Sequence, residues 1–587
     1  MVTVACLGLA GPAALAVPGA VSAVGAASAV ASPAASGIGG SWGKVEAVPG
    51  WAALKTVSGS ATTISCASAG NCLLVGSYET TVKRNEAFAD LEVNGKWTNS
   101  GEIPGYAALN KNAPSGYTGS AVSVSCPSAG NCAVTGYFSD KSDVVHGFVA
   151  DLTGGKKWRT QEIPYLATLN AQNGLTISKV SCASAGNCAV VGGYKAANGD
   201  TEPFVSLEYA GVWQDADSVL VSSAFNQGGN GIATAVSCPA ANRCVIGGET
   251  TDASDRTQSW IAYQNSPNSW GEFEPNGTAG VKNDPSNGAG VTGISCYSAG
   301  NCAVVGSYPG TTYDLPYVIN ENSGVWDKSA MTVSFAKLSP NASAQLTAVS
   351  CPSASECAAV GTYGDATPFT VDEIRGSWGP AIALPSYGIG ANPYAVSCGV
   401  PGDCAASGVY AVKSAATTTL QPFVADELGY GWHGAGQITG LATLNTGHLG
   451  IAVSVSCSSP GNCAAVGYYE HGSTMTPFIA ERKWTDPTAT RIALAPASVA
   501  YGHETTVKIT ITVSASVYVA PGPVRVKAGS TVLCTTWLRY VANVDTISCT
   551  LTAKKLPVGS YQVSAAYLGF PGYATSVSGW KKLTITH

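Results

Sequence analysis

Charged residues are scarce in this sequence of 587 residues, because Asp, Glu, Lys and Arg together make up only 11% of it. Long exposed helices need more charge than this, whereas short strands joined by turns do not. The 30 basic and 36 acidic residues give a net charge of −6, and no cluster of basic residues could neutralise a phosphate backbone. We therefore expect an all-β protein that does not bind nucleic acid.

Charge is absent altogether from residues 1–36, which are rich in alanine, valine and glycine. An apolar stretch followed by Ala-x-Ala choices, such as the one ending at Ala29, is typical of a secretory signal peptide. A transmembrane helix is the alternative, but Pro12 and Pro18 disfavour it. We expect an Ala-rich leader or signal peptide here, and a secreted or cell-surface mature protein of bacterial type without a membrane span.

Catalytic and metal-binding motifs are missing as well. The sequence has only six histidines, none of them spaced as a pair of metal ligands, and it contains no His-Glu-x-x-His motif. These absences predict no cofactor and no metal.

Cysteine, in contrast, is abundant, and sixteen of the nineteen cysteines form eight pairs with identical C-x5-C spacing. Successive first cysteines lie between 47 residues (351 to 398) and 60 residues (66 to 126) apart, which indicates a repeat architecture. The pairs are Cys66/Cys72, Cys126/Cys132, Cys182/Cys188, Cys238/Cys244, Cys296/Cys302, Cys351/Cys357, Cys398/Cys404 and Cys457/Cys463.

Each pair encloses a turn-forming stretch such as Ser-Ala-Gly-Asn and is flanked by alternating apolar residues, the pattern of a β-hairpin. Cysteines that face each other across the mouth of a hairpin lie within disulfide reach. Zinc is the rival interpretation, but it needs four converging ligands, and about fifty residues separate each pair from the next. We predict eight intra-hairpin disulfides, and a ninth between Cys534 and Cys549.

Two further markers recur in every period. An aromatic strand follows the hairpin, centred on Phe88, Phe148, Phe204, Trp260, Tyr317, Phe369, Phe423 and Phe478. A tryptophan follows after a turn, at positions Trp97, Trp158, Trp213, Trp270, Trp326, Trp378, Trp432 and Trp484. Each period therefore holds four short strands, which predicts the blades of a β-propeller.

The number of blades follows from the ends of the repeat. A fourth-strand pattern around Trp42 has no hairpin before it, and the last period is shortened after Phe478. We predict that the N-terminal strand pairs with the strand around Phe478, which closes an eight-bladed ring over residues 38–485. The short step from Cys351 to Cys398 keeps seven blades as an alternative.

The repeat resembles the bacterial secreted β-propeller repeats of the broad sialidase-like group that carries Asp-boxes. An Asp-box reads Ser-x-Asp-x-Gly-x-Thr-Trp. The corresponding aspartates here are Asp90, Asp151, Asp372 and Asp426. They stand six or seven residues before the tryptophan, and the Ser and Thr of the motif are not in place. The resemblance therefore implies the fold and not the activity.

Residues 488–587 have a different rhythm, with about seven strand patterns and no cysteine repeat. The stretch LPVGSYQVSAAYLG resembles a late strand of bacterial immunoglobulin-like domains, which implies a β-sandwich in which the Tyr561 hydroxyl closes a corner. The alternative is a plain alternating core strand. Such modules act as spacers or adhesive stalks.

The loops opposite the cysteine turns are long and varied, and we predict ligand binding there. A tyrosine recurs just past the second strand, at Tyr78, Tyr137, Tyr194, Tyr308, Tyr363, Tyr410 and Tyr468. These tyrosines either form an aromatic ring that binds a ligand or pack between the blades. Paired carboxylates for glycoside hydrolysis are conceivable among the loop aspartates Asp140, Asp143, Asp200, Asp252, Asp255 and Asp314. On the loop side, only Arg84 and Arg256 could grip a substrate carboxylate, too few for a sialidase-like site.

Two functions follow. The first is a monomeric secreted protein without catalysis that binds or adheres to an extracellular glycan or protein. The second is a secreted carbohydrate-active enzyme, a glycoside hydrolase or lyase.

Overall fold

The structure is a computed structural model. It describes residues 42–54, 56–111, 118–218, 226–254, 256–267, 269–275, 289–310, 312–327, 329–335, 338, 342–364, 366–384, 389–413, 417–483, 487–515, 520, 522–538, 546–569 and 573–587. The expected leader, Asp255 and Trp484 lie outside these residues. No helix in the described ranges has the length and apolar character needed to cross a bilayer.

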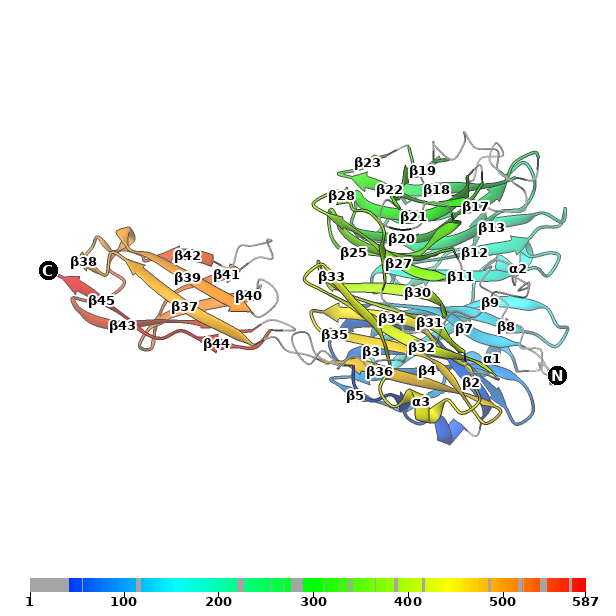
Figure 1. The fold of residues 1–587 in the computed structure, drawn as a ribbon, viewed down its shortest axis with the longest axis horizontal. Helices are drawn as coiled ribbons and strands as arrows, with labels where there is room; N and C mark the ends of the chain where they lie inside the picture. The colour runs from blue at the N-terminus through cyan, green and yellow to red at the C-terminus, as the bar shows by residue number, and fades with distance from the viewer. Residues whose placement is uncertain are drawn as a thin grey trace, which may run out of the picture.

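The cysteine repeat folds into successive antiparallel sheets, numbered here 1 to 8 in chain order (Figure 1). The first four consist of β2 (Thr56–Ser68), β3 (Asn71–Thr80), β4 (Asn85–Val93), β5 (Lys96–Trp97) and β6 (Gly101–Glu102); β7 (Gly119–Ser128), β8 (Asn131–Ser139), β9 (Val145–Thr153) and β10 (Lys157–Glu162); β11 (Thr176–Ser184), β12 (Asn187–Lys195), β13 (Thr201–Tyr209), β14 (Val212–Trp213) and β15 (Asp217–Ser218); and β16 (Ile232–Ser237), β17 (Val245–Thr251), β18 (Thr257–Ser266) and β19 (Ser269–Phe273).

Sheets 5 to 8 repeat this order. They consist of β20 (Gly290–Ser298), β21 (Asn301–Pro309), β22 (Asp314–Asn322), β23 (Val325–Trp326) and β24 (Met331–Thr332); β25 (Ala344–Ser353), β26 (Glu356–Tyr363), β27 (Thr367–Ile374), β28 (Ser377–Trp378) and β29 (Ile382–Ala383); β30 (Ile389–Val400), β31 (Asp403–Lys413), β32 (Thr418–Leu428) and β33 (Gly431–Gln437); and β34 (Gly450–Ser459), β35 (Asn462–His471), β36 (Thr474–Arg482) and β1 (Glu46–Ala47).

The first strands of these sheets form a closed circle, the arrangement of a β-propeller. Each first strand contacts the first strands of the preceding and following sheets, and β34 of sheet 8 contacts β2 of sheet 1. The strand predicted to close the ring is present, because Glu46 and Ala47 of β1 pair with Ile479 and Phe478 of β36. This pairing covers a sheet edge that would otherwise be open to association.

A serine before each first cysteine holds the circle together. Its hydroxyl oxygen accepts a hydrogen bond of 2.9–3.0 Å from the backbone N–H of the first cysteine in the next sheet, and the last bond returns from sheet 8 to sheet 1. The acceptors are Ser65, Ser125, Ser181, Ser237, Ser295, Ser350, Ser397 and Ser456. The Ser-Cys dipeptide therefore couples one sheet to the next.

All eight C-x5-C pairs form disulfides inside their hairpins, with the two Cα atoms 3.9–4.1 Å apart. The bridges are Cys66–Cys72, Cys126–Cys132, Cys182–Cys188, Cys238–Cys244, Cys296–Cys302, Cys351–Cys357, Cys398–Cys404 and Cys457–Cys463.

The second cysteines lie deeper than a position at the mouth of a hairpin suggests. Cys72, Cys244 and Cys302 are only 4–5% exposed and belong to hydrophobic clusters between neighbouring sheets. The reason is that each of them lies at the start of a second strand, most of which is buried between the adjacent sheets. These three cysteines form the predicted disulfides and are also core residues that stabilise the fold.

The Gly-Asn inside each hairpin has its own role, as sheet 2 shows. Gly130 has a φ of 71°, which favours glycine. The Asn131 side chain donates to Ser128 and accepts from the backbone N–H of Gly154. These bonds tie the cysteine turn to the next turn on the same side of the sheet.

Three of the links between sheets contain a single helical turn: α1 (Tyr106–Leu109), α2 (Leu166–Leu169) and α3 (Leu441–Leu444). Each begins with a buried residue, and each is followed by a buried asparagine. A 3-10 turn, η1 (Trp51–Leu54), precedes β2. The first helical residue and the following asparagine of each of these links are therefore packing residues.

The C-terminal region forms two sheets of a sandwich. One contains β37 (Thr488–Ala495), β39 (Lys508–Ala515) and β42 (Thr546–Thr550); the other contains β38 (Ser498–Ala500), β45 (Lys581–Thr586), β43 (Gly559–Tyr567), β40 (Gly522–Ala528), β41 (Thr531–Leu538) and β44 (Ser576–Val577), and η2 (Glu504–Thr506) follows β38. The Cys534–Cys549 disulfide joins β41 to β42, so it connects the two sheets. The Tyr561 hydroxyl donates to the Pro557 carbonyl at 2.7 Å, which is the predicted corner.

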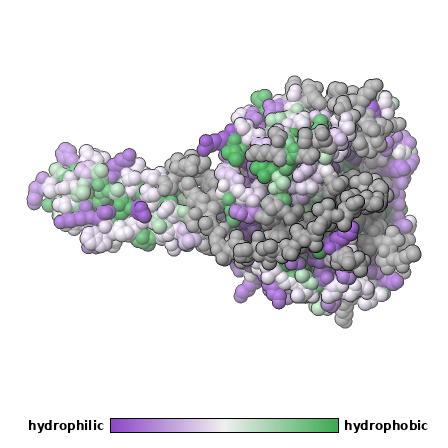
Figure 2. All heavy atoms as spheres, in the orientation of Figure 1, coloured by the Kyte–Doolittle hydropathy of each residue, from purple (hydrophilic) through white to green (hydrophobic). Residues whose placement is uncertain are grey.

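The sandwich is joined to the propeller on the side of the cysteine turns. Strand β36 ends at Arg482, which pairs with Cys463 beside the turn of sheet 8. Figure 1 shows the sandwich extending from that side, and Figure 2 shows hydrophilic residues spread over the visible surface of both bodies. We call this side of the propeller the cysteine face and the opposite side the loop face.

Candidate functional site

The loop-face aspartates hold the turns in which they lie. Asp140 accepts hydrogen bonds from the backbone N–H groups of Ser142 and Val144, at 2.7 and 3.1 Å. Asp252 likewise accepts from the N–H groups of Ser254 and Arg256, at 2.8 and 3.1 Å. These bonds and the charge of Arg256 lower the pKa of Asp252 despite some burial. Such a carboxylate is a poor proton donor at neutral pH.

Three of the other four predicted loop aspartates are described. The Asp200 carboxylate accepts a hydrogen bond from the Asn198 side chain at 2.6 Å. Asp143 occupies a turn with a φ of 62°, and the backbone N–H of Asp314 donates to Ser343. Asp140 and Asp143 share one turn, in which the backbone N–H of Asp143 donates to the Asp140 carbonyl at 3.2 Å, whereas Asp200 and Asp314 belong to separate loops.

Two arginines and a histidine of the loop face are paired within their own sheets. Arg84 forms an ion pair with Glu86 at 3.1 Å, and Arg256 forms one with Asp252 at 2.6 Å. His146 contacts Glu162 at 2.7 Å and stacks on Phe138 at a ring distance of 5.2 Å. The bond to Glu162 raises the pKa of His146. Neither arginine is therefore positioned to clamp a substrate carboxylate.

The seven predicted tyrosines occupy two positions of the second strand. Tyr78, Tyr194, Tyr308, Tyr363 and Tyr410 lie two residues after a glycine that pairs with the aromatic residue of the third strand. Tyr137 and Tyr468 lie one residue after that glycine, on the other face of their sheets. The tyrosine pattern therefore joins two structural positions that alternate along the strand.

Burial differs between the two positions. Tyr78, Tyr194, Tyr308 and Tyr410 are 4–6% exposed and belong to the hydrophobic clusters between sheets. Phe138 and Tyr469 hold the same position in sheets 2 and 8 and are buried as well. Tyr137, Tyr363 and Tyr468 are half-buried. Burial favours packing for the first position, and ligand binding by any of the seven stays a prediction.

An exposed tyrosine on the loop face did not stand out in the sequence. Tyr165 precedes α2 with a φ of 63° and is 53% exposed. The residues before α1 and α3 at this place are Gly105 and Gly440, with φ of 91° and 85°. A left-handed conformation costs a non-glycine residue on the order of 1 kcal/mol, so Tyr165 is strained at a place where the other two links have glycine.

On the cysteine face, the aspartates of the third strands bind the tryptophans of the next sheet. The indole N–H of Trp213 donates to Asp151 at 3.0 Å, and that of Trp432 donates to Asp372 at 3.2 Å. Trp378 donates in the same way to Asn320. Asp151 and Asp372, and Asp426 through Trp42, therefore connect neighbouring sheets, whereas Asp90 accepts from Thr98 of its own repeat at 3.4 Å.

A cavity of about 120 Å³ lies between sheets 2 and 3 on this face. Asp151 and Glu208 line it together with Arg159 and Asn131. Burial raises the pKa of Asp151 to about 6 and that of Glu208 to about 7, and the Asp151 charge adds to the second shift. Two carboxyl groups that share one pocket with an arginine can bind the hydroxyl groups of a ligand or exchange protons with it.

A related pair, Asp372 and Glu427, lies between sheets 6 and 7, where Tyr430 donates to Glu356. Burial raises the pKa of both carboxyls. Glu427 also lies near Cys398 and Cys404, a grouping that could suit a metal ion. However, both sulfurs belong to a disulfide, so no thiolate is present to bind a metal.

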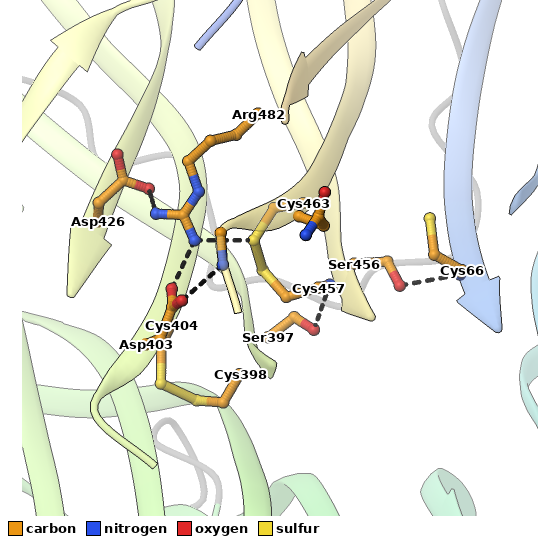
Figure 3. The surroundings of a disulfide bond; sticks show 12 residues. Cys66, Ser397, Cys398, Asp403, Cys404, Asp426, Ser456, Cys457, Cys463 and Arg482 are labelled. Carbon is orange, nitrogen blue, oxygen red and sulfur yellow. Dashed lines mark hydrogen bonds and ion pairs between the residues drawn. A yellow bond between two sulfur atoms is a disulfide. The ribbon is translucent and has the colours of Figure 1, made fainter. Parts of the chain in front are cut away.

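Between sheets 7 and 8 an arginine replaces the second acid of the pair. Arg482 is fully buried, and it contacts Asp403 at 2.6 Å and Asp426 at 2.8 Å (Figure 3). Trp42, next to the closing strand, also donates to Asp426. This ion-paired cluster joins the N-terminal segment, sheet 7 and sheet 8.

Comparison with known proteins gives a family for the C-terminal region. Residues 492–586 match the bacterial Ig-like domain (group 3). No curated protein matches the chain.

Among solved structures, the chain is similar to Sqt1 of Chaetomium thermophilum (TM-score 0.40, 10% identity, covering 72% of this chain and 97% of that one). It is also similar to the Hadza microbial sialidase Hz136 (0.32, 8%, 75% and 68%) and to the fucose-specific lectin from Aleuria aurantia (0.28, 14%, 55% and 95%). TM-scores this low support no conclusion about function.

Proposed function

We propose that this protein is a secreted, monomeric, eight-bladed β-propeller that binds an extracellular glycan on its loop face without chemical conversion, with the immunoglobulin-like domain as a spacer. The observation that carries the proposal is that the loop-face acids and arginines form hydrogen bonds and ion pairs within their own turns and sheets. Asp140, Asp252, Arg84 and Arg256 are engaged in their own turns and sheets, so they hold the surface and do not form a reactive group.

The attachment of the spacer supports the choice of face. The chain leaves sheet 8 from the cysteine face, so a surface-attached sandwich presents the loop face outward. Tyr165 offers an exposed ring on that side, and stacking of an aromatic ring on a sugar needs such exposure. Eight disulfides in short hairpins fit an oxidising extracellular environment.

A second candidate function rests on the cavity of Asp151 and Glu208. Carboxyl groups with pKa values of about 6 and 7 in one pocket are suited to proton transfer near neutral pH. A glycoside hydrolase at this place requires a sugar to enter from the cysteine face. The proposal of binding without turnover predicts that these two acids are dispensable.

The test is a panel of glycans and cell-wall preparations that measures both retention and product release. We compare the parent with Tyr165→Gly and with the double variant Asp151→Asn/Glu208→Gln. Binding without product, lost in the first variant and kept in the second, supports the proposal. Product release that disappears in the double variant establishes the enzyme instead.

A further inference from the structure

The inner wall of the propeller contains a single charged residue. The eight innermost strands are β2, β7, β11, β16, β20, β25, β30 and β34. Within their described ranges Lys179, in the middle of β11, is the one charged side chain. The other strands carry small residues three places before the cysteine, at Thr63, Ser123, Ala235, Gly293, Ala348, Ala395 and Ser454.

A break in the regular pairing of each first strand makes this wall accessible. In β11 the pairing with β12 shifts between Ile177 and Lys179, and the other seven first strands have a shift at the same place. The residue inside each shift keeps exposed surface, although it lies on an innermost strand. Since the strands form a circle, this exposed surface lies on the inside of the ring, in the space that we call the channel.

Lys179 extends into that channel. Its side chain is exposed, and yet burial by the surrounding protein lowers its pKa. Both properties fit a side chain that touches water inside a channel and has protein on all sides. In the described parts of the chain its ammonium group forms no hydrogen bond or ion pair, so no acidic residue neutralises it there.

Residues of other sheets that lie at a similar position along their first strands can complete a binding site around Lys179. Ser123 of the neighbouring sheet accepts from the backbone N–H of Val180, the residue after Lys179, at 3.2 Å. Its own hydroxyl hydrogen is not used in that bond, and Ser123 keeps 8% of its surface exposed. In sheet 7, four sheets away and so on the opposite wall, the residue inside the shift is Tyr394, which is 39% exposed.

From this placement we propose that the channel is a binding site for an anionic group, such as the carboxylate of an acidic sugar or a sulfate, with Lys179 as its cation. A hydroxyl from Ser123 donates to the same anion, and the Tyr394 ring faces the rest of a sugar ligand from the opposite wall. This site is separate from the loop-face surface and from the cavity of Asp151 and Glu208.

The variant Lys179→Ser tests the site with little risk to folding, because Ser123 and Ser454 stand at the same position in other sheets. Lys157→Ser is the matched control, since Lys157 is exposed on the outer strand β10. Titration calorimetry of the full chain with inorganic sulfate and with glucuronate is expected to show binding that is weaker by about tenfold or more in Lys179→Ser, because charge-assisted hydrogen bonds contribute about 1.5–3 kcal/mol. The control is expected to bind like the parent.

Amine labelling followed by mass mapping gives a second readout. Sulfate is expected to protect Lys179 from labelling and to leave Lys157 unprotected. In Tyr394→Ala, glucuronate binding is expected to weaken while sulfate binding persists. Absence of binding to the parent, equal binding by Lys179→Ser, or equal labelling of Lys179 with and without sulfate overturns the proposal.

Discussion

Replacing Arg482 by methionine tests how the propeller is closed. The guanidinium is fully buried between Asp403 and Asp426, and it is the cation that both carboxylates contact. Methionine fills a similar length without charge and leaves two buried acids together. Removing one partner of a buried ion pair costs about 3–5 kcal/mol, so we expect the free energy of unfolding to fall by that amount.

The loss is expected to depend on pH in a defined direction. The Arg482 charge lowers the pKa values of Asp403 and Asp426 against the raising effect of burial. Without it both folded pKa values rise further above their unfolded values. Acids of this kind favour the folded state below the unfolded pKa and lose that contribution as pH rises. The difference between parent and variant should therefore shrink on acidification.

Urea unfolding followed by tryptophan fluorescence measures both effects. The triple variant Arg482→Met/Asp403→Asn/Asp426→Asn is the matched control, and it should recover part of the loss because no buried charge remains. A loss below about 1 kcal/mol in Arg482→Met, with no dependence on pH, contradicts the assignment of this cluster to ring closure.

Three further predictions follow from the packing and the charges. Tyr194→Ala should lower the free energy of unfolding by about 3–5 kcal/mol in the same assay, since its ring is buried between sheets; an unchanged stability assigns the ring to ligand binding instead. The parent should be more stable at about pH 5 than at about pH 8, because burial raises the pKa of Asp90, Glu208 and Glu373 to about 7, and stability from such groups is lost as pH rises; thermal melts with the opposite trend contradict these shifts. Non-reducing digestion should find each C-x5-C pair linked within its own hairpin, and free thiols there contradict the described pairing.

Local features of the sequence were sufficient to predict the sheets, the disulfides and the closing strand. A hairpin is determined by residues that lie only a few positions apart, so cysteine spacing and turn residues were enough to predict it. The unpaired strand around Trp42 could be matched to the shortened last period. The long-range partners were not predictable in this way. The bond from Trp213 to Asp151 joins residues 62 positions apart, and its geometry depends on how neighbouring sheets stack. The burial of Cys72 has the same origin, because a neighbouring sheet covers it.

The candidate sites depended on finer detail. Tyr78 and Tyr137 look equivalent in the sequence, but a difference of one residue places them on opposite faces of their strands. Nothing in the sequence distinguished Tyr165 from other tyrosines. Its left-handed backbone shows that it occupies the position of Gly105 and Gly440. In the sequence, Lys179 is simply one residue of a predicted strand. Its place in the channel follows from the closed circle of the first strands.

Whether the loop face binds a glycan and leaves it unchanged is best measured by comparing the parent with Tyr165→Gly. Glycine stands at this place before α1 and α3, so the variant should be as stable as the parent or slightly more stable. We expect the variant to lose retention on the glycan that the parent binds, with equal melting temperatures and no product from either protein. Undiminished retention by Tyr165→Gly, or release of product by the parent, contradicts it.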